Sequence, residues 1–168
     1  MMRVLIVGLG SIAKKHITAL RSLTEEFKIF ALRSSPDAAE YHDVINVFNL
    51  DDTIYDFAII SNPTQLHVKY IKLLASKAIP LFIEKPAAHT LNDTEEIIKL
   101  LRSKQLTTYV ACNLRFHPCI KFLKENIDRQ ELIVNEVNVY CGSFLPDWRP
   151  GVDYTNTQYL GDIILKAY

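Results

Sequence analysis

The sequence has no excess of either charge sign. Its 168 residues include 19 lysines and arginines and 19 aspartates and glutamates. Without a net field, the chain has no general attraction for nucleic acids or anionic membranes. It also lacks an apolar run near the ~20 residues of a membrane-spanning helix, and an apolar strand begins within its first residues, so we expect no targeting segment. The expectation is a cytoplasmic protein with a small-molecule partner.

Cysteine is scarce as well. The three cysteines, Cys112, Cys119 and Cys141, are not spaced as in a metal knuckle, and they lie in segments with the pattern of strand or helix. We therefore expect buried, reduced thiols. The histidines also lack the spacing of a metal site, so no metal is predicted.

Apolar runs alternate with helical patterns along residues 3–112, which is typical of parallel strands joined by crossover helices. The sequence predicts an α/β fold with a Rossmann-type, doubly wound parallel sheet. The expected strands are residues 3–7, 28–32, 44–48, 56–60, 81–83 and 107–112.

Apolar residues at helical spacing predict the helices between these strands. They cover residues 12–23, residues 64–77, a segment capped by Asn92 with Glu95 three residues on, and residues 118–126. An aspartate at position 51 or 52 is expected to cap a single helical turn. His16, on the first helix, is expected to face the core and to be satisfied by a neighbour.

The first strand ends in a G-x-G-x-x-A turn formed by Gly8, Gly10 and Ala13. Such a turn leaves backbone N–H groups free at a helix N-terminus, where a pyrophosphate can bind. Gly8 supplies the tight turn, Gly10 allows close approach of the phosphate, and Ala13 lets helix and strand touch. The alternative is an ordinary strand-to-helix turn that needs glycine only for its geometry.

Ligands of an open α/β sheet bind outside the carboxyl ends of its strands, so residues that follow different strands should share one crevice. In this chain the unusual residues follow the strands. They are Gly8 to Ala13, Arg33 to Ser35, Asn62 to Thr64 with His67, Glu84 to Pro86, and Asn113 with Arg115.

This series resembles the glucose–fructose oxidoreductase and inositol dehydrogenase (Gfo/Idh/MocA) family over residues 1–126. The matching motifs are G-x-G-x-x-A with His16, then Ser-Asn-Pro-Thr-x-x-His from Ser61, Glu-Lys-Pro from Glu84, and Asn-x-Arg-Phe-x-Pro from Asn113. Trp148-Arg149 resembles the family's entry into its second domain. The resemblance implies a dehydrogenase that moves hydride between NAD(P) and a hydroxyl-bearing carbon of a sugar, cyclitol or nucleotide-linked sugar.

The resemblance also implies which residues bind the cofactor. The pyrophosphate would be held by Gly8, Gly10, Ser11 and Ile12. The nicotinamide half would be lined by Asn62, Pro63 and His67, with Glu84 on the nicotinamide ribose and Asn113 near the carboxamide or the substrate.

Lys85 is the expected catalytic residue, because the family uses this position to exchange a proton with the oxygen of the reacting carbon. Pro86 would hold it at a fixed angle, with a cis bond as one option. A physical argument agrees: beside a positively charged nicotinamide ring, such a lysine gives up its proton more readily. The alternative is a simple surface ion pair between Glu84 and Lys85.

Arg33, with Ser34 and Ser35, bears on the choice of cofactor. An acidic residue at the end of the second strand typically binds the ribose hydroxyls of NAD, whereas an arginine there accommodates the 2′-phosphate of NADP. We therefore expect NADP in preference to NAD. A nearby Asp37, or simple solvation of Arg33, are the competing interpretations.

The pattern changes after residue 118. From Glu136, apolar and polar residues alternate, which predicts a one-faced strand over residues 136–144 at the start of an α+β domain. The expected domains are a Rossmann domain of residues 1–118 and an incomplete C-terminal domain of residues 119–168, whose exposed strand a second copy of the chain would cover. The last ten residues have one glycine and no histidine, so Asp162 matches the family's substrate motif only loosely.

Two functions remain open from the sequence. The first is the dehydrogenase. The second is a module or truncated fragment that binds the cofactor without turnover, because an open crevice weakens the electrostatic interactions that hydride and proton transfer need. A purely structural domain would leave the Glu-Lys-Pro segment and Asn113 unexplained.

Overall fold

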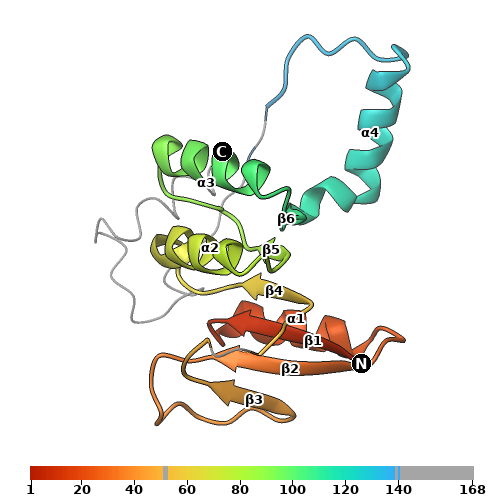
Figure 1. The fold of residues 1–168 in the computed structure, drawn as a ribbon. Coiled ribbons are helices and arrows are strands. Elements are labelled where there is room, and N and C mark those ends of the chain that lie inside the picture. Colours follow the sequence, from red (N-terminus) through yellow and green to blue (C-terminus); the bar gives the residue numbers. More distant parts are fainter. Residues whose placement is uncertain (51–52, 139, 141–168) are drawn as a thin grey trace. The chain divides into compact units, whose positions relative to one another are not determined.

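A computed structural model describes residues 1–50, 53–138 and 140 of the chain. Its six strands form one parallel sheet in the order β3-β2-β1-β4-β5-β6 (Figure 1). The elements are β1 (Met2–Val7), α1 (Ser11–Arg21), β2 (Phe27–Leu32), β3 (Val44–Val47), β4 (Phe57–Ile60), η1 (Thr64–Leu66), α2 (His67–Ser76), β5 (Leu81–Ile83), α3 (Leu91–Ser103), β6 (Thr108–Val110), η2 (Asn113–Phe116) and α4 (Pro118–Asp128).

The central strand β1 contributes to two hydrophobic clusters. Its side chains alternate between the two faces of the sheet. Val4 and Ile6 pack in one cluster with α1, while Leu5 and Val7 pack in the other with α2 and α3. Since helices cover both faces, the strand is apolar throughout its buried part, residues 4–7, as is typical of buried parallel strands.

The order of the strands locates the site. From β1 the chain moves outward through β2 and β3, then returns to β4 on the other side of β1. The direction of winding therefore reverses between β1 and β4, and ligands of such sheets bind at this point, beyond the carboxyl ends of the strands. The predicted Rossmann-type sheet is confirmed.

The helix α3 begins at a different cap from the expected one. The Thr90 hydroxyl oxygen accepts from the Asp93 backbone N–H (3.0 Å), and the hydroxyl donates to the Asp93 carboxylate (2.8 Å). The predicted cap at Asn92 is wrong because the helix starts earlier, at Leu91, and Asn92 lies inside its first turn. The predicted helix from residue 64 begins as the short 3-10 segment η1 and becomes α-helical only at His67.

The chain divides into two compact units, with the boundary between Ala111 and Cys112. In the second, His117 caps α4, because its ring Nδ1 accepts from the Cys119 backbone N–H (3.3 Å). The expected domain boundary after residue 118 stays a prediction.

The strand expected from Glu136 is not found in the part that can be examined. Residues 136–138 and 140 are not in a strand, and no described segment pairs with them, although a strand needs a hydrogen-bonded neighbour. The rest of that segment, the aspartates expected to cap a turn, Trp148 with Arg149, Cys141 and Asp162 lie outside the described residues.

Cys112 and Cys119 are free thiols, but both are exposed, so the prediction of burial is wrong for them. Cys119 lies on α4, where apolar residues such as Phe122 are exposed as well, so an apolar pattern there does not imply a core.

No helix in the described part of the chain is long and apolar enough to span a bilayer. Among the same residues, no group of three histidine, cysteine or acidic side chains could hold a metal ion.

Candidate dinucleotide and catalytic site

The turn between β1 and α1 needs its two glycines for different reasons. Gly8 has φ +84°, and a Cβ added to it would lie 2.6 Å from the Cα of Asn62. A side chain is therefore excluded there by both the backbone conformation and the packing. A Cβ on Gly10 would meet no atom of the described chain within 4 Å. The space beside Gly10, at the start of α1, is open.

The N-terminus of α1 has the features of an anion site. Gly10 is its N-cap residue and has an extended backbone, no side chain accepts from the first turn, and no acidic residue lies in that turn. Ser11 and Ile12 are exposed at the same end. The first backbone N–H groups and the positive end of the helix dipole therefore remain available to a negatively charged ligand.

The end of β4 is tied directly to this turn. The buried Ser61 hydroxyl lies 2.9 Å from the Gly8 carbonyl oxygen and 3.2 Å from that of Val7. The Asn62 side-chain amide is buried, and neither its nitrogen nor its oxygen has a hydrogen-bond partner among the described residues. Unsatisfied buried amides are uncommon, and a bound ligand is one way to complete them. Pro63, the next residue, is exposed.

His67 joins the end of β4 to the segment after β5. Its side chain is buried, and its two ring nitrogens each lie 2.9 Å from a backbone carbonyl oxygen, one of Asn62 and one of Pro86. In this geometry His67 fixes two loops relative to each other. Its expected place beside the nicotinamide stays a prediction.

The Glu84 carboxylate is held from the side of α1. The Nε2 of His16 donates to its Oε1 (2.8 Å), and the Lys85 backbone N–H donates to its Oε2 (3.2 Å). Burial alone would raise the pKa of Glu84. The hydrogen bond and charge of His16, together with the amide and charge of Lys85, outweigh burial and hold that pKa below its ordinary value. The expected satisfied histidine on the first helix is thus His16, with Glu84 as its partner.

Lys85 itself is exposed, and no carboxylate in the described part of the chain lies within ion-pair distance of its ammonium. The alternative of a surface ion pair with Glu84 therefore does not describe this structure, because Glu84 pairs with His16. The Lys85–Pro86 peptide bond is cis. The Lys85 ammonium is therefore exposed just after the end of β5.

Arg33 and Ser34 follow β2. Ser34 is exposed, whereas Arg33 is half-buried and its Nη1 donates to the Ala39 carbonyl (3.2 Å) and the Asn46 Oδ1 (3.3 Å). The interpretation of Arg33 as a merely solvated side chain is wrong, since the chain holds its guanidinium. No local sequence pattern pointed to Asn46, because it lies on β3, 13 positions from Arg33.

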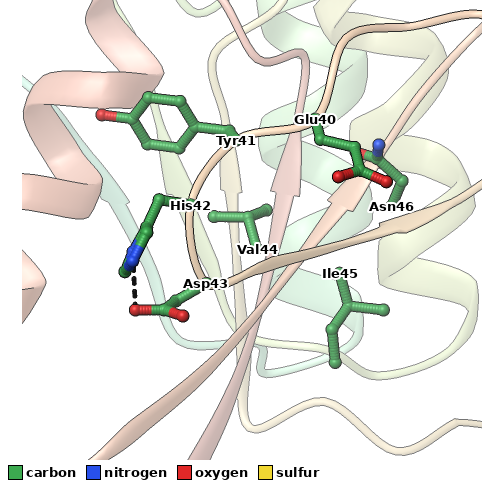
Figure 2. A pocket seen from close by; sticks show the side chains of 7 residues that line it. All are labelled: Glu40, Tyr41, His42, Asp43, Val44, Ile45 and Asn46. Carbon is green, nitrogen blue, oxygen red and sulfur yellow. Dashed lines mark ion pairs between the residues drawn. The ribbon is translucent and has the colours of Figure 1, made fainter.

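A surface hollow includes Asn46, the partner of Arg33, but none of the site residues predicted from the sequence. It is lined by residues 40–46, which include the exposed ion pair of His42 with Asp43 at 2.7 Å (Figure 2). Most of these residues precede or begin β3, so they lie away from the carboxyl ends of the strands. Asn113 begins η2 in the second unit, where it is exposed.

Comparison with known proteins identifies the family. Residues 2–112 match the profile of the family described as "Oxidoreductase family, NAD-binding Rossmann fold" (GFO_IDH_MocA). The chain belongs to this family. The match covers the first unit and the motifs at the ends of β1, β2, β4 and β5.

Individual relatives of this Gfo/Idh/MocA chain are distant. An uncharacterised protein of Saccharomyces cerevisiae is 28% identical over 83% of the chain, which spans 44% of that protein. The scyllo-inositol 2-dehydrogenase (NADP(+)) IolU of Bacillus subtilis is 24% identical over 84% of the chain, which spans 46% of it. The chain thus spans less than half the length of these relatives.

A solved structure shares the fold. The WlbA dehydrogenase of Chromobacterium violaceum, crystallised with NADH and UDP-GlcNAcA, superimposes with a TM-score of 0.69 at 23% identity, covering 77% of this chain and 40% of that one. The likeness shows the Rossmann-type fold alone. The residues of this chain must carry any argument about the ligand.

Those residues fit a nicotinamide dinucleotide. The open space beside Gly10 and the free amides of α1 suit a pyrophosphate, and the unsatisfied Asn62 amide lies at the next strand end. Gly8, Gly10, Ser11, Asn62 and Glu84 belong to one unit and gather at one edge of its sheet.

Proposed function

We propose that this chain carries the dinucleotide site of a dehydrogenase, in which hydride moves between NADP or NAD and a hydroxyl-bearing carbon of a sugar, cyclitol or nucleotide-linked sugar. The observation that supports this most is the placement of Lys85: it is exposed, has no carboxylate partner among the described residues, and is flanked by residues that two histidines hold. The relative named as a scyllo-inositol dehydrogenase and the dehydrogenase crystallised with UDP-GlcNAcA support the substrate class.

In this proposal, separate groups of residues bind the cofactor and move the proton. The first amides of α1 bind the pyrophosphate, and Asn62, Pro63, His67 and Glu84 orient the nicotinamide half. The role expected for Asn113 near the carboxamide or the substrate stays a prediction. The nicotinamide, when bound, supplies the hydride acceptor. The Lys85 amine would take the proton from the substrate hydroxyl as its carbon gave up hydride, so that an alcohol would become a ketone and the proton would stay on Lys85.

For the cofactor we propose NADP in preference to NAD. The half-buried Arg33 guanidinium and the exposed Ser34 follow β2, where the 2′-phosphate of NADP would lie, and the first residue after the strand is not acidic. The relative named as an NADP(+) enzyme and the structure crystallised with NADH show that both cofactors occur among similar proteins. A cytoplasmic location and assembly into a homo-oligomer stay predictions.

A second candidate is a module that binds the cofactor without turnover. It is favoured by the coverage, since the chain spans less than half of its relatives. The residues proposed for the pyrophosphate and the nicotinamide ribose lie in the described Rossmann unit, whereas more than half of the length of each of these relatives lies outside the matched region.

The two candidates separate in one experiment. NADPH and NADH are titrated into the purified chain by nicotinamide fluorescence, and oxidation of a panel of sugars and inositols is measured with each oxidised cofactor. For the dehydrogenase, Lys85→Ala keeps the cofactor Kd within about twofold but lowers turnover by roughly 10² to 10⁴. Lys99→Ala, an exposed lysine on α3, is the matched control and should change neither quantity.

Saturable binding without turnover by the wild type would favour the module. Absence of saturable binding of both cofactors would exclude both candidates.

A further inference from the structure

His16 connects α1, whose N-terminus is the proposed phosphate site, with the Glu84-Lys85 segment after β5. The two side chains are 68 positions apart in sequence, and Nε2 of His16 lies 2.8 Å from Oε1 of Glu84. Both side chains are largely shielded, with 19% of His16 and 13% of Glu84 exposed. A short hydrogen bond to a carboxylate in such a place is stronger than one between neutral groups and less screened than a surface pair.

The direction of this hydrogen bond is fixed by chemistry. An ionised carboxylate only accepts, so the Nε2 of His16 carries the proton and donates whether the ring is neutral or charged. The lowered pKa of Glu84 agrees with a carboxylate that stays ionised beside this donor. Two aromatic contacts also hold the His16 ring in place. The ring packs edge-on against Phe82, with 5.3 Å between the ring centroids, and Phe82 stacks on Tyr109, with 5.6 Å between theirs.

Glu84 in turn acts on Lys85 in two ways. Its second oxygen accepts from the Lys85 backbone N–H, which orients the peptide. Its carboxylate pairs with His16 and does not lie within ion-pair distance of the Lys85 ammonium. Without His16, the nearest carboxylate would be free to turn toward that ammonium and hold it away from a substrate.

We propose that His16 is a positioning residue, which fixes the Glu84 carboxylate for the nicotinamide ribose and keeps it from pairing with Lys85. This inference rests on the proposed function, since it assumes a dinucleotide at the edge of the sheet. His16 does not touch the cofactor in this proposal. It acts through Glu84, and its effect should be confined to the nicotinamide half.

The test compares NADH with ADP, which lacks the nicotinamide half. NADH reaches Glu84, whereas ADP carries only the diphosphate and adenosine that α1 and β2 would bind. His16→Leu should weaken NADH binding about tenfold, as expected for the loss of a hydrogen bond to a charged group, and leave ADP binding within about twofold. His16→Gln keeps an N–H donor and should recover most of the NADH affinity. Ala19→Leu, an exposed change on the same helix, is the control and should alter neither.

A double-mutant cycle supplies the second measurement. If His16 acts only through Glu84, His16→Leu added to Glu84→Gln should cost little further NADH affinity. His16→Asn, which is polar but too short to reach Glu84, should reproduce the loss and replaces the leucine variant if that chain does not fold.

Unchanged NADH affinity in His16→Leu, or an equal loss for NADH and ADP, would overturn the positioning role. A wild-type chain that binds neither NADPH nor NADH would instead overturn the proposed function, so the two failures can be told apart.

Discussion

Gly8 and Gly10 stand two positions apart in one turn, yet the chain constrains them differently. Gly8 combines a positive φ with a close approach to the Asn62 backbone, so it serves the fold. Gly10 has an ordinary backbone conformation and empty space where a side chain would go. That space is useful only if something else enters it, which is why Gly10 points to a ligand and Gly8 does not.

Alanine substitutions should separate these two roles. Gly8→Ala forces a non-glycine residue into a left-handed conformation, which costs about 1–2 kcal/mol, and adds a clash with backbone, so we expect a loss of at least about 2 kcal/mol in the free energy of unfolding. Gly10→Ala should change stability by less than about 0.5 kcal/mol but weaken cofactor binding. Urea unfolding and NADPH titration measure the two effects. Equal stability losses in both variants would contradict this division.

The Glu84 carboxyl should make stability depend on pH. Burial raises its pKa, but the hydrogen bond and charge of His16, together with the amide and charge of Lys85, outweigh burial and hold that pKa below the ordinary value in the folded chain. The stability it contributes is therefore fully present above the ordinary carboxyl range and is lost as the pH falls through the lowered folded pKa. Wild type should exceed Glu84→Gln in stability near pH 6, and the difference should shrink toward about pH 3.

Urea unfolding across that range checks this expectation, with Glu95→Gln, an exposed carboxyl on α3, as the control. A difference between wild type and Glu84→Gln that is independent of pH would show that Glu84 acts by shape and not by charge.

At the level of elements, the strands could be predicted well because each is an apolar run bounded by a polar or glycine turn. The strand β5, expected at residues 81–83, is found there, and β1 differs by one residue. The helix starts were harder. Thr90, Asn92 and Asp93 can all cap a helix, and only the backbone decides which of them lies at its first turn.

Substitutions can test which residue caps α3. Thr90→Ala removes the hydroxyl that accepts from the Asp93 N–H, so it should lower the free energy of unfolding by about 1 kcal/mol. Asn92→Ala changes an exposed residue inside the first turn and should have an effect below about 0.5 kcal/mol. Chemical denaturation of the two variants measures both. A larger loss for Asn92→Ala would restore the cap predicted from the sequence.

Much of the candidate site was also predictable, because strand ends of a parallel sheet meet at one edge and this chain has its unusual residues there. The contact between His16 and Glu84 was not. It depends on Glu84 facing the same side of the sheet as α1, and on the angle at which that helix crosses the strands. The side that Glu84 faces could be inferred from the alternation of a strand, since Phe82 packs on the α1 side and Glu84 lies two positions later. No sequence pattern gives the angle at which α1 crosses the strands.

At the scale of the whole molecule, the residues proposed to hold the pyrophosphate and the nicotinamide ribose lie in one compact unit that ends at Ala111. Binding should therefore stabilise that unit as a whole. Saturation with NADPH at about 100 times its Kd adds about 2.7 kcal/mol to the folded state and should raise Tm by roughly 8–12 °C. Thermal unfolding with and without NADPH measures this, and Gly10→Ala at the same concentration should show a smaller rise.

No rise at saturating NADPH or NADH would contradict a dinucleotide site in this unit. A rise with NADPH at concentrations where NADH has little effect would support the role given to Arg33.

The position of β1 in the middle of the sheet also affects how the chain is made. One edge of β1 pairs with β2 as soon as residues 27–32 are available, but the other edge pairs with β4, which begins at Phe57, some 53 positions after its partner Val4. At ~5–20 residues per second of synthesis, that edge stays open for roughly 3 to 10 seconds on the ribosome. During this interval, the central strand of the sheet has unpaired backbone groups, so the nascent chain is most exposed to wrong pairing before its centre is complete.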